Sequence, residues 1–132
     1  MLYLLDTNAV SDIQRGKYNV GQRMEEELAK KNQLAICPIV YYEIIRGLEA
    51  INAYKKLQDF FQMCKETFLL LPLDYAIFAK AAKIHVSLRR GQQIEDNDIY
   101  IAATAIVNGC TLVTANDKHF SRIDGLKVEN WR

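Results

Sequence analysis

The stretch LYLLDTN, residues 2–8, opens with a short apolar run that stops at an acid, Asp6, followed by two small polar residues. A run of this length is typical of a buried β-strand, and the residues after it are typical of a helix start. An aspartate in this place has two interpretations. It caps the following helix, because Asp is a favoured N-cap residue, or it forms one wall of an active site.

The chain has 132 residues, half of them apolar, and we expect a single domain over residues 1–132. The formal net charge of +1 argues against a strongly basic nucleic-acid-binding surface but leaves room for a local basic patch. No apolar run approaches the roughly 20 residues that span a bilayer. Without an export signal, we expect a cytoplasmic protein with no membrane partner and with reduced thiols at Cys37, Cys64 and Cys110.

Strand-like and helix-like segments alternate along the whole chain. Apolar runs predict strands at 2–5, 34–37, 68–71 and 111–114, with a last edge strand at 127–129. Helical periodicity is present at 20–28, from Pro38, at 57–64, at 73–88 with Asp74 as cap, and at 98–107. This alternation predicts an α/β fold with three layers, α/β/α, around a mostly parallel central sheet.

Three details of this prediction are specific enough to check. The continuous apolar run Phe68–Leu71 indicates a strand covered on both faces. Glu27 and Lys31, at i,i+4, indicate a solvent-exposed helix face. The sequence Arg89-Arg90-Gly91 indicates a helix end.

Four acidic residues lie at or near positions that a parallel sheet would bring to one edge. Asp6 follows the first strand, and Asp117 follows the strand that ends at Thr114. Asp98 begins a helix, and Glu43 lies in the helix after the second strand. Ligands of open α/β sheets bind beyond the carboxyl ends of the strands. We therefore expect these acids to meet at one edge of the sheet.

Carboxylates held close together raise one another's pKa values unless a cation lies between them. Oxygen ligands suit a hard cation, so the set predicts a Mg²⁺ or Mn²⁺ site. Such an ion activates water and neutralises a phosphodiester, so the set indicates metal-assisted phosphodiester hydrolysis.

Each acid also has a purely structural interpretation. Asp6 and Asp98 are both plausible helix caps, and Asp96 competes with Asp98 for that place. Asp117 is suited to an Asx-turn, and Glu43 is spaced to pair with Arg46 on a helix surface. The set is more informative than any member because its members share placement near strand ends.

Four segments then resemble the motifs of PIN-domain nucleases, in particular the VapC-like toxins of type II toxin–antitoxin pairs. They are YLLDTNAVS at 3–11, YYEIIRG at 41–47, DIYIAATA at 98–105 and TLVTANDKHFSRIDGLKVENW at 111–131. The resemblance covers essentially the whole chain, with all four motifs in the family's order.

The resemblance implies site positions residue by residue. The family's acids fall on Asp6, Glu43 and Asp98. Its last motif resembles T-x-N-x-x-[DEH]-F, which puts Asn116 on the polar site position, while other members carry an acid in this loop, here Asp117. Asp6, Glu43, Asp98, Asn116 and Asp117 are therefore the candidate catalytic residues, with Asp6, Asp98, Glu43 and Asp117 as candidate metal ligands.

The same resemblance implies a metal-dependent endoribonuclease that cuts structured RNA, either transfer RNA or ribosomal RNA. It also implies a cognate antitoxin protein and a homodimeric toxin. RNA-binding candidates near the motifs are Arg15, Lys17, Arg46, Lys118 and Arg122, and His119 is a further candidate for contact with substrate.

Two alternatives belong to other functional classes. An acid after the first strand also occurs in phosphatases that form an aspartyl-phosphate, but these need a second acid where this chain has Asn8. The other alternative is a non-catalytic binding or regulatory module that keeps the acidic pocket without turnover.

Overall fold

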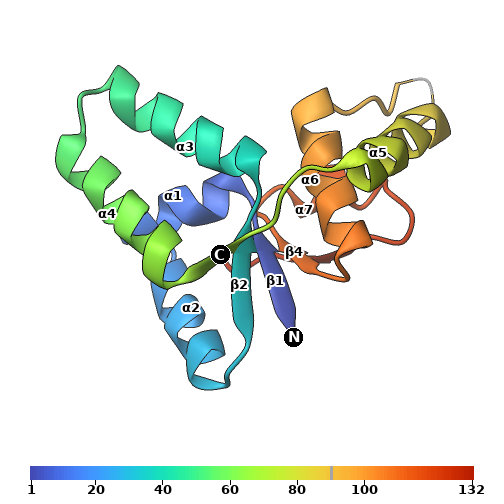
Figure 1. The fold of residues 1–132 in the computed structure, drawn as a ribbon. Coiled ribbons are helices and arrows are strands. Elements are labelled where there is room, and N and C mark those ends of the chain that lie inside the picture. Colours follow the sequence, from blue (N-terminus) through green and yellow to red (C-terminus); the bar gives the residue numbers. More distant parts are fainter. Residues whose placement is uncertain (90) are drawn as a thin grey trace.

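The described residues, 1–89 and 91–132 of a computed structural model, form a five-stranded sheet with helices on both sides (Figure 1). The strands are β1 (Leu2–Leu5), β2 (Gln33–Ile36), β3 (Phe68–Leu70), β4 (Thr111–Val113) and β5 (Lys127–Glu129). The helices are α1 (Thr7–Arg15), α2 (Val20–Ala29), α3 (Pro38–Ala50), α4 (Tyr54–Glu66), α5 (Tyr75–Ser87), α6 (Asp96–Val107) and α7 (Asp117–Phe120).

The strand order is β3-β2-β1-β4-β5, and every neighbouring pair is parallel. The predicted α/β architecture is thus confirmed. The first two crossovers run outward from β1, and their helices α1 to α4 lie on one side of the sheet (Figure 1). After β3 the chain returns past β1 to β4. Because such crossovers are right-handed, α5 and α6 then lie on the opposite side.

Local signals set several helix ends. Gly16 ends α1 with a φ of 63°, a left-handed conformation that glycine adopts without strain. Pro38 occupies the first turn of α3, where its missing N–H costs nothing. Asp74 caps α5 and accepts a hydrogen bond from the backbone N of Ile77 at 3.0 Å. The ends at Pro38 and Asp74 agree with the sequence signals.

The core lies on both faces of the central strands. Leu4 and Leu5 of β1 and Leu112 of β4 are fully buried, as expected for strands covered by helices on both faces. Phe60 of α4 and Phe120 of α7 are also fully buried. The ends of β1 and β4 therefore rest on a closely packed support, which fixes the residues that follow them.

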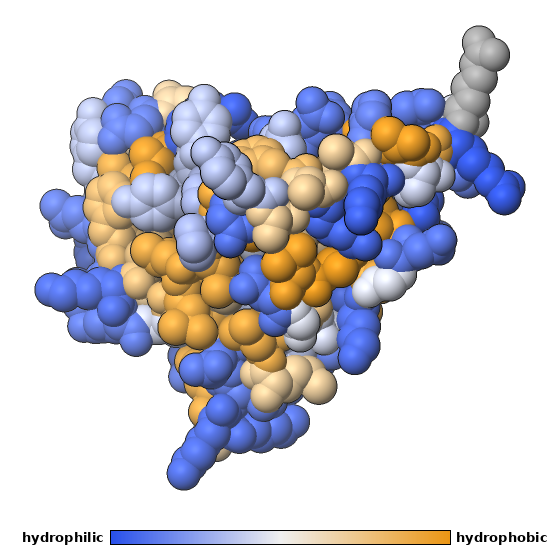
Figure 2. Space-filling model, turned by 45° about the vertical axis from the view of Figure 1, so that its right-hand side comes forward, coloured by the Kyte–Doolittle hydropathy of each residue, from blue (hydrophilic) through white to orange (hydrophobic). Residues whose placement is uncertain are grey.

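The expectation that Phe68–Leu71 is covered on both faces is wrong. β3 is the edge strand of the sheet, and although Phe68 is buried, Leu69 and Leu70 are 42% and 55% exposed. Figure 2 shows apolar patches between charged side chains on one face of the molecule. A continuous apolar run looks the same in the sequence of a central strand and of an exposed edge strand. The run therefore predicted burial that Leu69 and Leu70 do not have.

Two smaller expectations also need correction. Glu27 is 2% exposed rather than solvated, and it pairs with Arg23 at 3.5 Å and Lys30 at 3.6 Å instead of Lys31. Helix α6 begins at Asp96, so Asp98 lies inside its first turn.

The expected helix end at Arg89-Arg90-Gly91 includes Arg90, which lies outside the described residues. Among the helices that the described residues form, none has the length and apolar character needed to cross a bilayer.

Candidate active site

Asp6 lies at the carboxyl edge of the sheet and has two structural roles there. Leu5 of β1 pairs with Val113 of β4, so Asp6 and Thr114, the next residues along the two strands, lie side by side. The Asp6 carboxylate is the N-cap of α1, where Oδ1 accepts a hydrogen bond from the backbone N of Thr7 at 2.8 Å. The helix-cap interpretation of this acid is therefore confirmed, while its second oxygen faces β4.

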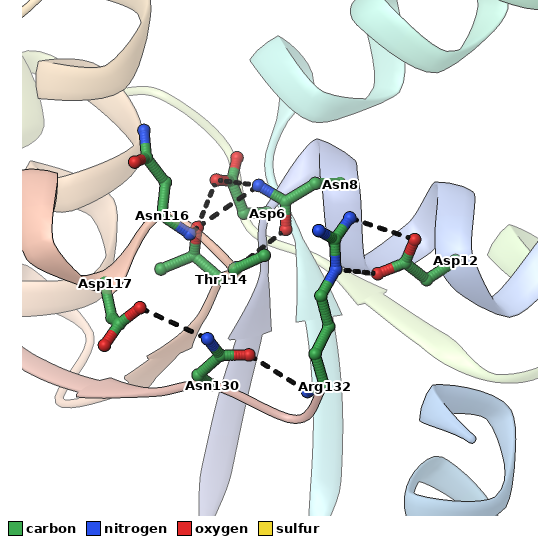
Figure 3. A network of polar contacts seen from close by, with 9 residues as sticks. Asp6, Asn8, Asp12, Thr114, Asn116, Asp117, Asn130 and Arg132 are labelled. Carbon is green, nitrogen blue, oxygen red and sulfur yellow. Dashed lines mark hydrogen bonds and ion pairs between the residues drawn. The ribbon is translucent and has the colours of Figure 1, made fainter. Parts of the chain in front are cut away.

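Three donors fix the Asp6 carboxylate, which is 5% exposed, and Figure 3 shows two of them, Thr114 and Asn8. In addition to Thr7 N, the Thr114 hydroxyl donates to Oδ2 at 2.8 Å and the Asn8 amide donates to Oδ2 at 3.2 Å. Asn8 also accepts a hydrogen bond from the backbone N of Ala115 at 2.9 Å. Asn8 thus joins the start of α1 to the end of β4, a role that the sequence analysis did not assign to it.

Glu43 comes to this edge from α3 and is held by the residue after Asp6. The Thr7 hydroxyl donates to Glu43 Oε1 at 2.9 Å. The other oxygen, Oε2, lies 3.9 Å from Nη2 of Arg46, so the expected helix-surface pair is present as a long contact. The Glu43 side chain is 22% exposed, which leaves it accessible from solvent.

Asp98 reaches the same edge from the first turn of α6. The amino end of a helix stabilises a carboxylate through its exposed N–H groups. The Asp98 Oδ2 atom lies 3.4 Å from Nε2 of His119, and the two side chains are 29% and 24% exposed. His119 belongs to α7, so this contact connects α6 to the segment that follows β4.

The acids at this edge lie close enough for their charges to act on one another. Burial raises the pKa of Asp6, hydrogen bonds from Thr114 and Thr7 oppose the rise, and the charge of Glu43 adds to it. Burial also raises the pKa of Asp98; the charges of Asp6 and Glu43 raise it further, while His119 lowers it. Asp6, Glu43 and Asp98 therefore form one electrostatically coupled anionic site.

Asn116 and Asp117 follow β4 but extend in different directions. The backbone N of Asn116 donates to the Thr114 hydroxyl oxygen at 3.0 Å. In Figure 3 the Asn116 side chain extends to the side on which the Asp6 carboxylate lies, whereas the Asp117 carboxylate extends toward Asn130. Asp117 Oδ1 accepts a hydrogen bond from the Asn130 amide at 3.2 Å. The structure thus brings together Asp6, Glu43 and Asp98, and turns Asp117 to a different partner.

Comparison with known proteins identifies the family. The model of the PIN domain matches residues 3–126. The chain belongs to the PIN-domain family.

Relatives place this PIN domain among the VapC ribonucleases. It is 37% identical to Ribonuclease VapC2 of Rickettsia felis over 142 aligned positions, covering 99% of this chain and 98% of the relative. It is 36% identical to Ribonuclease VapC1 of Methanocaldococcus jannaschii over 128 positions, covering 95% and 85% of the two chains. A crystal structure of VapBC2 from Rickettsia felis, bound to a promoter DNA fragment, matches the fold with a TM-score of 0.85 at 30% identity, covering 100% of both chains.

A groove of about 180 Å³ adjoins the acidic edge of this PIN domain. Thr7 and Glu43 line it together with Arg15 and Lys56. Arg15 is one of the basic residues that the sequence analysis named as RNA-binding candidates. The amide of Gln14 donates to the carbonyl oxygen of Lys56 at 2.9 Å, which fixes α4 against α1 along the groove.

The acidic side chains at this edge do not by themselves form a complete metal-binding site. Among residues 1–89 and 91–132, no three His, Cys, Asp or Glu side chains are placed closely enough to hold an ion together. Mg²⁺ usually keeps several waters and binds through one or two carboxylates. The donor set at this edge fits an ion of that kind, with the other acids acting through water.

Proposed function

We propose that this protein is the toxin of a VapC-type toxin–antitoxin pair, a metal-dependent endoribonuclease that hydrolyses phosphodiester bonds in structured RNA. The main support is the placement of Asp6, Glu43 and Asp98 at one edge of the sheet in a PIN domain, where Thr7 binds both Asp6 and Glu43. Relatives named ribonucleases support the reaction, and the VapBC complexes among the structural matches support a cognate antitoxin. Transfer RNA and ribosomal RNA are the proposed substrates.

The proposed ligands for Mg²⁺ or Mn²⁺ are Asp6 and Asp98, directly or through water. A divalent ion at this edge supplies activation of water and neutralisation of phosphate charge. Thr114 and Asn8 hold the Asp6 carboxylate in one orientation and keep its oxygens hydrogen-bonded in a buried setting. The protein therefore supplies a preorganised site that needs little rearrangement during the reaction.

Glu43 is proposed to orient the attacking water. The Thr7 hydroxyl fixes Glu43 Oε1, and Oε2 remains beside Arg46, where it can accept a proton from water. Attack by this water on phosphorus breaks the bond to the leaving nucleotide oxygen, so one water is consumed in each cut. Arg46 lies close enough to the acids to contact a phosphate of the bound strand.

The polar position of the last motif is assigned to Asn116 rather than Asp117. The Asn116 side chain extends on the side of Asp6, and the Asp117 carboxylate is held by Asn130 (Figure 3). Asp117 is therefore proposed to stabilise the segment after β4 instead of binding the ion.

The aspartyl-phosphate alternative requires Asp6 as a nucleophile. Both Asp6 oxygens already accept hydrogen bonds and the side chain is 5% exposed, an arrangement that supports a ligand role. A homodimer is also proposed, supported by exposed apolar side chains on one face of α5, among them Tyr75 and Phe78 at 94% and 44% exposure.

Cleavage of purified RNA tests the function. The parent protein, incubated with transfer RNA and ribosomal RNA, is expected to produce discrete new ends in Mg²⁺ or Mn²⁺ and none in EDTA. Asp6→Asn should lower the rate by at least about 100-fold, since it removes a charged ligand from the site. Asp59→Asn, the same change at an exposed acid paired with Lys55, should cut like the parent.

Cleavage by Asp6→Asn at the parent's rate, or cleavage unaffected by EDTA, would overturn the proposal. Mapping of RNA ends in cells after brief induction then identifies the RNA. A neighbouring gene that encodes a small DNA-binding protein with a flexible tail, copurifying with this chain, would supply the antitoxin.

A further inference from the structure

His119 reaches the acidic site from α7, the short helix that follows β4. Its Nε2 atom is 3.4 Å from Oδ2 of Asp98. Within the described part of the chain, no other hydrogen bond or ion pair reaches the Asp98 carboxylate. Asp6, by contrast, has three donors in Thr7, Thr114 and Asn8.

The imidazole of His119 is anchored independently of Asp98. Its ring packs edge-on against Phe120, with centroids 5.5 Å apart and planes at 84°, and Phe120 is fully buried. The backbone N of His119 donates to the carbonyl oxygen of Asn116 at 3.1 Å. One end of the ring thus rests on the core, and the Nε2 end faces the carboxylate.

This arrangement suits a fixed donor aimed at the Asp98 carboxylate. An imidazole with its hydrogen on Nε2 donates in that direction, whether or not Nδ1 is also protonated. The present 3.4 Å is longer than a formed hydrogen bond of about 2.7–3.2 Å, and such contacts at active sites often shorten when a ligand binds.

We propose that His119 is a positioning residue for Asp98, donating from Nε2 to Oδ2 so that the carboxylate is held in the orientation that takes up the divalent ion. The inference rests on the proposed function, because it assigns Asp98 to the ion. His119 itself contacts neither the ion nor the RNA. A partner that orients a ligand typically changes ion affinity by roughly 10- to 100-fold when it is removed.

Three variants separate this role from simple packing. His119→Ala removes both the donor and the ring, while His119→Gln keeps an amide donor at a similar reach without the ring. His85→Ala makes the same histidine change on the exposed surface of α5, where His85 forms no hydrogen bond or ion pair with Asp98 among the described residues. Thermal unfolding of each variant without metal reports any loss of packing against Phe120.

The decisive measurement is the affinity for Mn²⁺ without RNA, followed by calorimetry or by the spin-resonance signal of free Mn²⁺. His119→Ala should weaken Mn²⁺ binding by roughly 10-fold or more, and His119→Gln should recover most of that loss. The KM for RNA, at saturating Mn²⁺, should change by less than about 2-fold, because ion binding rather than RNA binding is affected. His85→Ala should match the parent in all three measurements.

Parent-like Mn²⁺ affinity in His119→Ala would overturn the inference. So would Mn²⁺ affinity in His119→Gln as weak as in the alanine variant, when both variants are folded. If the parent protein itself bound no Mn²⁺ and cut no RNA, the proposed function would fail instead, so the two failures are distinguishable.

Discussion

The hydroxyl of Thr114 donates a hydrogen bond to Oδ2 of Asp6 at 2.8 Å, joining residues that lie 108 positions apart in the sequence. The contact exists because β4 pairs directly with β1 in the sheet. Thr114 is fully buried, and its oxygen also accepts hydrogen bonds from Asn8 and from the backbone N of Asn116. One hydroxyl therefore connects the first and last motifs of the site.

Replacing Thr114 with Val should damage both stability and activity. The change leaves Asp6, Asn8 and the Asn116 N–H short of a buried partner, at a cost of about 1–3 kcal/mol in the free energy of unfolding. RNA cleavage should fall by roughly 10-fold, because the Asp6 carboxylate loses a positioning contact. Urea unfolding and single-turnover cleavage measure the two effects.

Thr104→Val is the matched control for that change. Thr104 is equally buried, but its hydroxyl donates to the carbonyl of Tyr100 within α6. Its loss should lower stability slightly and leave cleavage unchanged. Cleavage by Thr114→Val at the parent's rate would show that this hydroxyl does not position Asp6.

Asn116→Ala and Asp117→Ala should have opposite consequences. Asn116 extends on the side of the Asp6 carboxylate, so its loss should reduce cleavage by at least about 10-fold with little change in stability. Asp117 binds Asn130, so Asp117→Ala should cut like the parent and unfold slightly more easily. A reversal of the two cleavage results would return the ion-binding assignment to Asp117.

The contribution of Asp6 and Asp98 to the stability of the metal-free protein should fall as pH rises. Burial raises the pKa values of Asp6 and Asp98 in the folded state above the ordinary value of an aspartate. The folded state therefore binds protons more readily than the unfolded chain, and ionisation destabilises it. This cost is absent below the unfolded pKa and is complete above the raised pKa. Thermal unfolding in EDTA across the acid range measures the trend.

The Asp6→Asn variant tests how much of this pH dependence comes from Asp6. It removes one ionisation, so its stability relative to the parent should increase with pH by about 1.4 kcal/mol for each unit by which the pKa is raised. Mg²⁺ should raise the melting temperature of the parent at neutral pH more than that of Asp6→Asn, because an ion that binds only the folded state stabilises it. A difference between the two proteins that does not vary with pH would contradict this account.

Arg132 should stabilise the fold through Asp12. Its Nε and Nη2 atoms lie 2.7 and 3.2 Å from the two oxygens of Asp12, which is 3% exposed. Arg132→Gln should lower the urea midpoint, because it leaves a buried carboxylate without its cation. The double variant with Asp12→Asn should recover most of the loss. Lys55→Gln, which breaks an exposed ion pair with Asp59, should change the midpoint little.

Much of the fold follows from the sequence because its signals are local. Apolar runs identify most of the strands, and helical periodicity identifies most of the helices. Each pattern shows which side of its own segment is buried. The Asp74 cap and Pro38 predict helix starts in the same way. The same local signals fail at Leu69 and Leu70, because a run of apolar residues does not say whether another strand lies beside it.

By itself, the sequence determined the alternation of strands and helices, and it placed Asp6 after the first strand, Glu43 within a helix and Asp98 near a helix start. Tertiary structure alone decided that β4 lies beside β1, that Asp117 turns to Asn130, and that His119 faces Asp98. The physical reason is the distance along the chain over which each kind of signal acts. Backbone geometry and periodicity act over a few neighbouring residues, whereas a contact between distant segments depends on how the whole core packs.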